Sequence, residues 1–497
     1  MQALISLYDK TGLDALAPAL VEAGYSLIAS GGTSDALAEL GIAHTTVEDL
    51  TGFPSLFGGR VKTLHPAIHG PILADRTKVD HVEELRAQGW SPIDLVVVNL
   101  YPFDADPSIE LIDIGGPALV RAAAKNFESV TVVVDPGDYQ RISKGIAVGL
   151  SLDERKALAA KAFAYVSAYD SRVARWLTGE ETSGLLPYTT LNLRRVRELR
   201  YGENPHQSGA LYVDDSETPS GWATAHWLGT EEPSYLNIFD ADGAQHLLDR
   251  LGDSPACVIV KHGGPCGVAR RANIQDAYVE AFDGDPLSAF GGVVAINRPL
   301  TPELATLMLD RPKFDVLVAP GVVGPAEETI LAKRRRSRIV LFEGATASRQ
   351  IRSVAGGYLV QLPDDLEGID GFRLVTSRTP SDGELEDAWM AVAVAQAAAS
   401  NAVVIVKDQV AVGVGQGQPS RVDASRIAVA KAGDRASGGV GASDAFFPFP
   451  DGLETLISAG VTTVVAPSGS VKDDEIAKVA ERAGISLLFA PRRHFRH

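Results

Sequence analysis

The segment LVVVNLYPF (Leu95–Phe103) joins a continuous apolar run to a polar end. Its apolar part, Leu95–Leu100, has no polar face, which is typical of a strand covered on both sides of a parallel sheet. Similar short runs occur at Ala3–Leu7, Tyr25–Ala29 and Val130–Val134. Helical patterns separate these runs, and they lie at Leu13–Ala23, Asp35–Leu40, Val79–Gln88 and Pro117–Asn126. The alternation predicts an α/β domain with a parallel sheet over residues 1–135.

Polar and glycine-rich motifs follow the strands of this sheet. Parallel sheets bind ligands at the carboxyl ends of their strands, where SGGT (Ser30–Thr33) and NLYPF (Asn99–Phe103) lie. Glycines let backbone approach a ligand, and helix N-termini attract anions. In GGRVKTLHP (Gly58–Pro66), Arg60 and Lys62 would point the same way in extended backbone and suit a phosphate. Taken alone, SGGT fits an ordinary tight turn equally well, and the basic loop is better explained as a solvated surface loop.

The motif IDIGGPALVRAAAKN (Ile112–Asn126) is more specific. Asp113 precedes a Gly-Gly-Pro helix start, and Arg121 and Lys125 share one helix face. A carboxylate, a lysine and the phenol of Tyr101 are suitable groups for moving protons within a purine-like ring. The alternative is a capped helix that carries exposed cations.

Composition limits the class of protein. The 497 residues are 45% hydrophobic and 22% charged, which allows a large core and about three domains. The net charge of −17 disfavours a nucleic-acid partner. The two cysteines, Cys257 and Cys266, exclude a disulfide scaffold and suit a reducing cytoplasm. The sequence shows no signal peptide and no apolar run of membrane-spanning length, so a cytoplasmic location without membrane contact is expected.

The second half shows signs of duplication. The sequence VIVK occurs at Val258–Lys261 and again at Val404–Lys407. Each copy precedes a glycine-rich segment and, further on, a second apolar run, at Gly291–Ile296 and Val461–Ala466. This order predicts two α/β lobes, at residues 193–380 and 381–497, with a helix at Gly383–Ala399 between them. An alanine-rich helical connector is expected at 136–192.

Two motifs of this half can carry chemistry. KHGGPCG (Lys261–Gly267) sets a lysine beside a histidine, which can act as a base near neutral pH. Neighbouring residues on a strand point in opposite directions, so both can face one site only if the backbone turns, which the glycines permit. RYGENPHQ (Arg200–Gln207) is a polar run of the kind that serves recognition. The alternative for Lys261 and His262 is an exposed strand-end turn.

Thirteen motifs, in order, resemble one family of bifunctional purine-biosynthesis enzymes. The family combines phosphoribosylaminoimidazolecarboxamide (AICAR) formyltransferase with IMP cyclohydrolase. The motifs are DKTGL, SGGT, TGFP, GGRVKTLHP, VVNLYPF, IDIGGPALVRAAAKN, RYGENPHQ, KHGGPCGVA, DPLSAFGGVVAINR, SNA, GQGQPSRVDASRIA, SDAFFPF and HFRH. The resemblance implies a methylglyoxal-synthase-like domain followed by two cytidine-deaminase-like lobes without zinc.

The resemblance also implies two sets of site residues. For ring closure, the catalytic residues would be Lys62, Tyr101, Asp113 and Lys125, and the nucleotide would be held by Ser6, Asp9, Lys10, Ser30, Gly31, Gly32, Thr33, Arg60, Thr63, Asn99 and Ile114. For formyl transfer, the catalytic pair would be Lys261 and His262, and AICAR would be held by Arg200, Tyr201, Gly291, Asp315, Asn401, Arg421, Phe446 and Arg493. Val422, Asp451 and Ser470 would lie near the folate.

The implied chemistry is formyl transfer from 10-formyltetrahydrofolate to the 5-amino group of AICAR, followed by dehydrative closure to IMP. His262 would be the base, and Lys261 would stabilise the oxyanion or protonate the departing folate nitrogen. The expected partners are AICAR, formyl-AICAR, IMP and folate, with no metal site, and a monovalent cation such as potassium stays open. The family implies a homodimer.

Six positions depart from the family pattern. Gly264 stands where Asn or Ser is usual, and Gln416 where Ala is usual. Tyr8 replaces a frequent Ser, Ala399 a common Lys, and Pro450 a frequent Arg; Pro419 is a further change beside Gln418. These changes concern nucleotide and folate contacts rather than the catalytic groups.

Two other functions are open to test. A nucleotide-sensing module would explain residues 1–135, but it would leave RYGENPHQ and KHGGPCG without a purpose. A zinc deaminase needs a Pro-Cys-x-x-Cys pair beside a further ligand, which Cys257 and Cys266 do not supply.

Overall fold

The computed structural model describes residues 1–146, 149–179, 185–215, 217, 219–342, 344, 349–366 and 368–497. They form two compact units. The first comprises Met1–Arg194 and the segment Asp214–Thr218, and the second comprises Arg195–Val213 and Pro219–His497.

The first unit is built on a parallel sheet. Within the described part of this unit the strand order is β3-β2-β1-β4-β5. The strands are β1 (Gln2–Ser6), β2 (Ser26–Ala29), β3 (His44–Thr46), β4 (Leu95–Val98) and β5 (Thr131–Val133). The helices are α1 (Leu13–Glu22), α2 (Gly31–Glu39), α3 (Val47–Thr51), α4 (Pro66–Leu73), α5 (Val79–Ala87), α6 (Gly115–Lys125), α7 (Tyr139–Ile146) and α8 (Leu152–Thr178).

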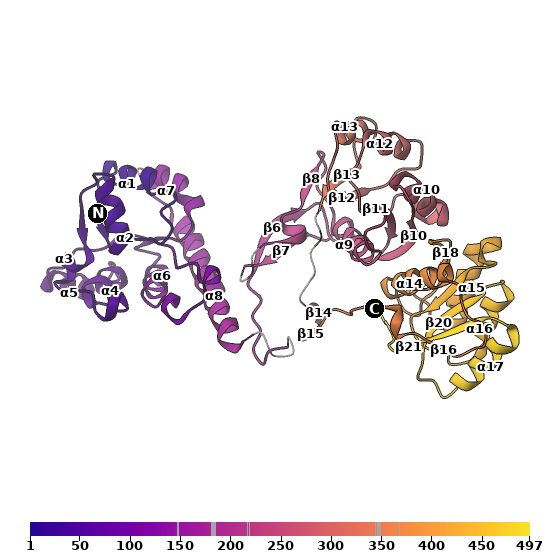
Figure 1. Cartoon of the computed structure of the whole chain (residues 1–497). Coiled ribbons are helices and arrows are strands. Elements are labelled where there is room, and N and C mark those ends of the chain that lie inside the picture. The colour runs from indigo at the N-terminus through magenta and orange to yellow at the C-terminus, as the bar shows by residue number, and fades with distance from the viewer. Residues whose placement is uncertain are drawn as a thin grey trace. The chain divides into compact units, whose positions relative to one another are not determined.

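Helices cover both faces of this sheet, as the apolar strands predict. Ala3 and Ile5 of β1 pack in one cluster with residues of α1 and α7, whereas Leu4 packs in another with residues of α6 and α8. The alternation follows from the two-residue period of a strand. Figure 1 shows α6 and α8 side by side on one face. The parallel α/β fold expected for this part of the chain is confirmed.

The sequence pattern located most of these elements to within a few residues. The prediction was less complete between the second and fourth strands, where β3, α3 and α4 lie in a stretch expected to be rich in loops. These three elements are short, and α4 contains Pro71, so their periodicity is weak. The helix expected from Asp35 begins earlier, at Gly31. In the segment expected to be a connector, α8 packs into the core of the first unit, and a capping box of Ser151 and Glu154 begins it.

The second unit is built on a long mixed sheet. Among the described residues its order is β16-β21-β20-β19-β17-β18-β10-β9-β11-β12-β13-β8. The strands are β8 (His226–Leu228), β9 (Ala256–Lys261), β10 (Gly264–Arg270), β11 (Val293–Ile296), β12 (Val316–Ala319), β13 (Arg338–Leu341), β16 (Arg373–Leu374), β17 (Val403–Lys407), β18 (Val410–Gly415), β19 (Val440–Ser443), β20 (Thr463–Pro467) and β21 (Ser486–Ala490). Two separate ribbons are formed by β6 (Leu193–Leu199) with β7 (Gly209–Asp214), and by β14 (Gln350–Val354) with β15 (Gly357–Gln361).

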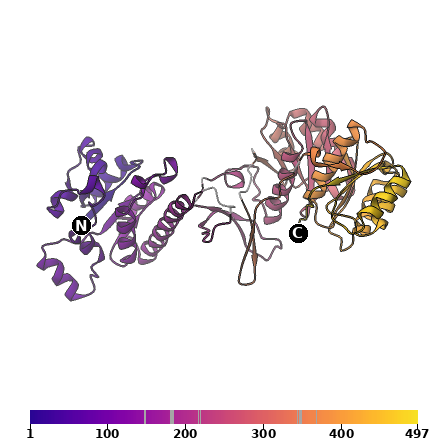
Figure 2. The same ribbon diagram turned by 60° about the horizontal axis from the view of Figure 1, so that its bottom comes forward.

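Helices flank this sheet on both faces. They are α9 (Tyr235–Arg250), α10 (Ile274–Gly284), α11 (Pro286–Ala289), α12 (Pro302–Leu309), α13 (Ala326–Lys333), α14 (Asp382–Ala397), α15 (Arg421–Ala432), α16 (Pro450–Ser458) and α17 (Asp473–Ala483). Residues of α9 and α14 belong to one core cluster, and residues of α10, α12 and α15 belong to the other. In Figure 2 the yellow helices α16 and α17 lie side by side.

The predicted internal duplication is present in the fold. The first lobe has the hairpin β9–β10 followed by α10 and β11, and the second has the hairpin β17–β18 followed by α15 and β19. In each lobe the first strand of the hairpin pairs antiparallel with the strand after the helix. The lobes meet where β10 pairs antiparallel with β18. We call the two sides of the sheet at which its strands begin and end its edges. Because β10 and β18 run in opposite directions, the β9–β10 turn and the β17–β18 turn lie at opposite edges.

Candidate active sites

In the first unit, the SGGT motif leads from β2 into the N-terminus of α2. Gly31 has φ 47°, in the left-handed region that favours glycine. A Cβ on Gly31 would lie 3.1 Å from Nζ of Lys62, and a Cβ on Gly32 would lie 3.4 Å from Nζ of Lys10. Two ammonium groups therefore lie beside the N-terminus of α2, and together they have the chemistry of an anion site.

Hydroxyl groups connect this turn to the end of β1. Oγ of Ser6 and Oγ of Ser30 are 3.0 Å apart. The buried Oγ1 of Thr33 accepts a hydrogen bond from the N–H of Leu7 at 2.8 Å and donates one to its carbonyl at 3.1 Å. The carboxyl ends of β1 and β2 are thus tied together by side chains that the sequence assigned to the nucleotide.

Asn99 connects the end of β4 to the same loop. Its Oδ1 accepts hydrogen bonds from the N–H groups of Tyr8 and Asp9 at 2.6 and 3.0 Å, and its Nδ2 donates to the carbonyl of Asp9 at 2.7 Å. Nζ of Lys10 donates to the carbonyl of Tyr8 at 2.9 Å. The Asp9 carboxylate accepts hydrogen bonds from the side chain and backbone of Thr11, which lower its pKa. In this arrangement Asn99 and Asp9 shape the loop that carries Lys10.

Asp113 and Tyr101 are the residues expected to move protons at this site. Oδ1 of Asp113 accepts the N–H of Gly116 at 2.8 Å at the start of α6. Burial raises the pKa of Asp113, against the hydrogen bonds from Gly116 and Gly115. Burial also raises the pKa of Tyr101, and the charge of Asp113 adds to the effect. The ring of Tyr101 meets that of Tyr8 edge to face, with centroids 5.4 Å apart. A carboxyl group with a raised pKa is suited to exchanging protons near neutrality.

Only some of the predicted residues of the GGRVKTLHP loop lie at this site. Nζ of Lys62 lies 3.2 Å from Oε1 of Glu48, and Oγ1 of the buried Thr63 lies 2.7 Å from where a Cβ on Gly115 would be. Arg60 is exposed and forms an ion pair with Glu110. Ile114 is exposed at the N-cap of α6. Lys62 and Thr63 therefore face the site, while Arg60 would have to leave Glu110 to bind a phosphate.

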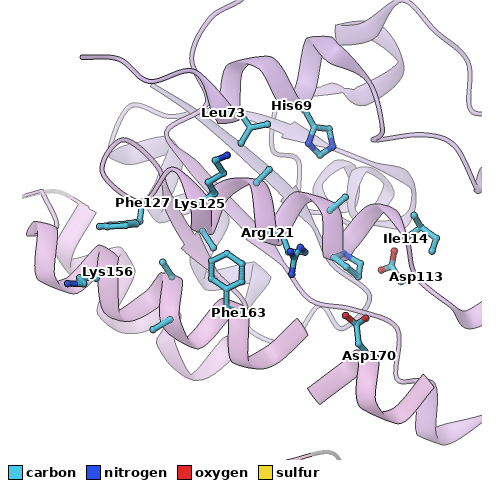
Figure 3. Close-up of a pocket in the computed structure, with 16 residues that line it drawn as sticks. His69, Leu73, Asp113, Ile114, Arg121, Lys125, Phe127, Lys156, Phe163 and Asp170 are labelled. Atoms are coloured by element: carbon cyan, nitrogen blue, oxygen red, sulfur yellow. The ribbon is translucent and has the colours of Figure 1, made fainter. Parts of the chain in front are cut away.

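Lys125 stands apart from these residues. A cavity of about 970 Å³ lies along α4, α6 and α8, and Figure 3 shows Asp113 and Lys125 at opposite ends of α6 beside it. Ten residues of α-helix span about 15 Å. The structure therefore does not bring Lys125 of this chain to Tyr101 and Lys62.

In the second unit, the predicted site residues lie along one edge of the long sheet. This edge holds the carboxyl ends of β9, β18, β19, β20 and β21 and the amino ends of β10, β11, β12, β13 and β17. The residues at or directly beside these ends are Lys261, His262, Gly291, Asp315, Asn401, Arg421, Val422, Phe446, Asp451, Ser470 and Arg493. Segments far apart in sequence lie along this edge because β10 of the first lobe pairs antiparallel with β18 of the second.

The predicted catalytic pair, Lys261 and His262, lies at a tight turn between β9 and β10. His262 has φ 53° and Gly263 has φ 77°. Nζ of Lys261 donates to the carbonyl of Phe290 at 2.6 Å. The next residue is Gly291, where a Cβ would lie 4.0 Å from Oδ1 of Asp315. Lys261, Gly291 and Asp315 therefore share the edge with the histidine, and the turn required by the sequence argument is present.

Arg200 and Tyr201 are anchored near the end of β8. The guanidinium of Arg200 lies 5.0 Å from the centre of the Tyr201 ring, and its Nη1 is 3.3 Å from Oε2 of Glu231. The N–H of Arg200 donates to the carbonyl of Pro233 at 3.0 Å. The Arg200 guanidinium is half-exposed although it is paired with Glu231, so it is available to an anionic ligand.

Asn401 and Arg421 form a buried polar cluster in the second lobe. Arg421 donates to Oδ1 of Asn401 and to Oγ of Ser443, both at 2.6 Å, and forms an ion pair with the fully buried Asp444. Asp444 in turn accepts a hydrogen bond from Oγ of Ser400 at 2.5 Å. This network holds the guanidinium at the carboxyl end of β19 with little freedom.

The predicted folate residues lie at helix starts on the same edge. Val422 is in the first turn of α15, Asp451 is in the first turn of α16, and Ser470 precedes α17. The Asp451 carboxylate accepts the N–H of Gly452 at 2.8 Å. Phe446 is half-buried after β19, and the guanidinium of Arg493 lies 4.6 Å from the centre of the Phe495 ring. No ligand group of three or more His, Cys, Asp or Glu occurs among the described residues.

The sequence argument missed Asp240. This buried residue of α9 accepts hydrogen bonds from the N–H groups of His262 and Gly263. The duplication could have revealed it, because Asp387 of α14 stands 21 residues before Asp408, much as Asp240 stands 22 residues before His262.

Comparisons with known proteins show which proteins the chain is similar to. A family model described as AICARFT/IMPCHase bienzyme matches residues 123–431, and a model of the MGS-like domain matches residues 12–126. The chain is 44% identical to the bifunctional purine biosynthesis protein PurH of Roseobacter denitrificans, over 100% of this chain and 98% of the relative. It is equally similar to the PurH proteins of Dinoroseobacter shibae and Rhodospirillum rubrum, over the same shares of both chains. A solved structure entitled "Crystal structure of ForH" aligns with 37% of this chain and 99% of its own, at 36% identity and a TM-score of 0.34.

No helix among the described residues combines the length and apolar character needed to cross a membrane. The matches extend over both units, and the relatives are covered almost completely. The chain belongs to the AICARFT/IMPCHase bienzyme family of bifunctional purine-biosynthesis enzymes, and it carries AICAR formyltransferase and IMP cyclohydrolase activity.

Proposed function

We propose that formyl transfer takes place along the ligand-binding edge of the long sheet and ring closure takes place at the carboxyl ends of β1, β2 and β4. The observation that supports this division most directly is the placement of Lys261, His262 and the second-lobe residues on one edge. Residues 1–135 would then close the ring, and the two lobes at 193–380 and 381–497 would make its precursor, with 136–192 between them.

In the proposed ring closure, the anion site at α2 holds the 5′-phosphate. Lys10 and Lys62 face the Gly31–Gly32 turn, and the hydroxyls of Ser6, Ser30 and Thr33 complete its polar lining. Asp113 and Tyr101 lie next to each other on the neighbouring strand end, and each has a raised pKa. Asp113 would move a proton between the amide and formyl groups as water leaves, and the Tyr101 phenol would donate to the departing oxygen.

In the proposed formyl transfer, His262 removes a proton from the 5-amine of AICAR as the nitrogen attacks the formyl carbon. The carbonyl electron pair moves onto oxygen, and Lys261 stabilises that oxyanion. When the intermediate collapses, the bond to the folate nitrogen breaks and that nitrogen takes a proton. Arg200 and Arg421 would bind the anionic nucleotide, and Asp315 and Asn401 would orient its ring. The formyl donor would be 10-formyltetrahydrofolate, held beside Val422, Asp451 and Ser470.

The working molecule is proposed to be a cytoplasmic homodimer. Lys125 supports the dimer, because it lies a helix length from Asp113 in its own chain. A lysine that takes part in ring closure from this position would have to reach the site of a second copy. Whether a monovalent cation such as potassium is needed is a further part of the proposal, testable by dialysis into sodium and potassium buffers.

One coupled experiment tests the two-site proposal. Purified full-length protein is supplied with AICAR and 10-formyltetrahydrofolate, and IMP is followed by its ultraviolet absorbance. Lys125→Ala is expected to accumulate formyl-AICAR, whereas His262→Ala is expected to block its formation. If both variants accumulate the same species, the division into two sites is wrong.

The same experiment separates the alternatives. A nucleotide-sensing module would bind IMP without turnover, and a zinc deaminase would release ammonia and contain zinc by metal analysis. Cys257 and Cys266 argue against the deaminase, because both thiols are buried within β9 and β10. Substrate-dependent formation of IMP favours the bifunctional enzyme over both.

A further inference from the structure

The turn that carries His262 has an unusual backbone. His262 and Gly263 are the two central residues between β9 and β10, and their φ angles are 53° and 77°. Two positive φ values in a two-residue loop are typical of a type I′ hairpin turn. Glycine adopts this conformation without cost, but a histidine in it is strained, because its Cβ crowds the backbone. Something must hold His262 in this conformation.

Asp240 of α9 provides such a restraint. Its Oδ2 accepts the N–H of His262 at 3.2 Å, and its Oδ1 accepts the N–H of Gly263 at 2.7 Å. Asp240 is 7% exposed, so water does little to replace either bond. The two carboxylate oxygens accept from two successive N–H groups, which both face Asp240 in this turn conformation.

The second lobe contains a matching turn that is also held by a carboxylate but has no histidine. Asp408 and Gln409 connect β17 to β18 with φ angles of 49° and 59°. Their N–H groups donate to Oδ2 and Oδ1 of Asp387 in α14, at 2.9 and 2.7 Å. Because the lobes join head to tail, this turn lies at the opposite edge of the sheet, a strand length of about 17–20 Å from the candidate site. The fold thus holds both turns in the same way, and only one of them carries a proposed catalytic side chain.

We propose that Asp240 is a positioning residue for formyl transfer, which holds the His262–Gly263 turn so that the imidazole stays on the edge occupied by Lys261 and Gly291. The inference rests on the proposed role of His262. Without the two acceptors, His262 is free to relax to negative φ, which swings its Cα–Cβ bond and moves the ring away from the amine. Asp240 acts through the backbone and takes no proton in the reaction.

The matched pair Asp240→Asn and Asp387→Asn tests this proposal in the full-length protein. In each variant an amide NH₂ replaces one acceptor and faces a backbone N–H. Asp240→Asn is expected to lower kcat for formyl transfer about 10- to 100-fold, with the KM for AICAR within about threefold and cyclohydrolase activity on formyl-AICAR unchanged. Asp387→Asn is expected to retain both activities. Equal effects of the two variants on formyl transfer would overturn the proposal.

Two further variants keep the result interpretable. Gly263→Ala disturbs the same turn without touching the carboxylate, since φ is 77° and a Cβ would lie 2.9 Å from the Phe239 ring. Gly263→Ala is expected to reproduce the loss of kcat for formyl transfer. It also tests the role of the turn if Asp240→Asn does not fold. Full formyl transfer activity in Gly263→Ala would contradict the proposal.

Asp240→Glu restores two acceptors, and it is expected to recover part of the lost kcat. No recovery of kcat in a folded Asp240→Glu protein, or a lowered melting temperature with an unchanged kcat in Asp240→Asn, would overturn the positioning role.

The His262→Ala control distinguishes this inference from the proposed function. If His262→Ala keeps its formyl transfer activity, the proposed base is wrong and the positioning role fails with it. If His262→Ala is inactive while Asp240→Asn is fully active, only the positioning role is overturned.

Discussion

The carboxamide of Gln416 occupies the space that a side chain at Gly264 would need: a Cβ on Gly264 would lie 2.4 Å from its Oε1. Gln416 also donates to the carbonyl of Pro265 at 3.3 Å, and so connects the end of β18 to the start of β10. Both residues depart from the pattern that the family resemblance implies, in which Asn or Ser is usual at position 264 and Ala at position 416. We expect the two changes to compensate, because the polar group that the first removes would be supplied from the facing strand by the second.

This compensation predicts strong coupling between the two positions. Gly264→Asn alone should clash with Gln416 and destabilise the fold by about 2–3 kcal/mol, with loss of formyl transfer. Gly264→Asn combined with Gln416→Ala should recover most of both. Urea unfolding and formyl transfer rates of the single and double variants give the coupling free energy, expected at about 1–3 kcal/mol. Simple additivity of the two changes would show that the positions do not compensate.

Close packing of α15 on β18 gives a second prediction. A Cβ on Gly413 would lie 2.1 Å from the carbonyl oxygen of Ala428, which is backbone and cannot rotate away. Gly413→Ala should therefore lower the free energy of unfolding by about 3 kcal/mol. Gly383→Ala is the control: nothing lies within 4 Å of its Cβ position in the first turn of α14, so it should be neutral or slightly stabilising. Thermal unfolding of the two variants checks the contrast, and similar melting temperatures would contradict it.

The Glu384 carboxylate gives a pH-dependent prediction. Burial opposes its ionisation, but hydrogen bonds from Ser381, Thr462, Arg378 and Thr463 outweigh burial and lower its pKa to about 2. A depressed carboxyl pKa stabilises the fold above the pKa of the unfolded chain and loses that effect as the pH falls toward the folded value. Glu384→Gln should thus cost about 2 kcal/mol at pH 7 and progressively less between pH 4.5 and 2.

Urea unfolding of wild type and Glu384→Gln at pH 7, 4 and 3 measures this difference. A difference between the two proteins that stays constant across these pH values would show that ionisation of Glu384 does not contribute to stability.

Tyr8 gives a prediction for the cyclohydrolase site. Its edge-to-face contact with Tyr101 is worth about 0.5–1.5 kcal/mol, which corresponds to roughly a 2- to 10-fold change in rate if it is needed to place the phenol. Tyr8→Ser should lower kcat/KM for ring closure by that factor, and Tyr8→Phe, which keeps the ring, should not. Formyl transfer in the same preparations serves as the control. Identical ring-closure kinetics in wild type and Tyr8→Ser would remove Tyr8 from the site.

Much of the N-terminal fold could be predicted from the sequence, because continuous apolar runs such as Leu95–Val98 and their spacing from the helices are local properties. The prediction was weakest at β3, α3 and α4, which are too short to show a period. Two buried partners of the site residues were not predicted. Only the duplication could have pointed to Asp240, and Asp444 has no local signal, since the importance of each depends on which turn or guanidinium it contacts.

The sequence by itself determined the family, the α/β class and the duplication, and it supplied the candidate residues of both sites, because motifs and periodicities are local properties of the chain. Only the tertiary structure decided which of these residues share a site. The antiparallel pairing of β10 with β18 inverts one lobe relative to the other. His262 therefore lies at the same edge of the sheet as Arg421, whereas Asp408, which occupies the matching turn of the second lobe, lies at the opposite edge. Such a choice depends on contacts between segments far apart in sequence, and no local pattern encodes it.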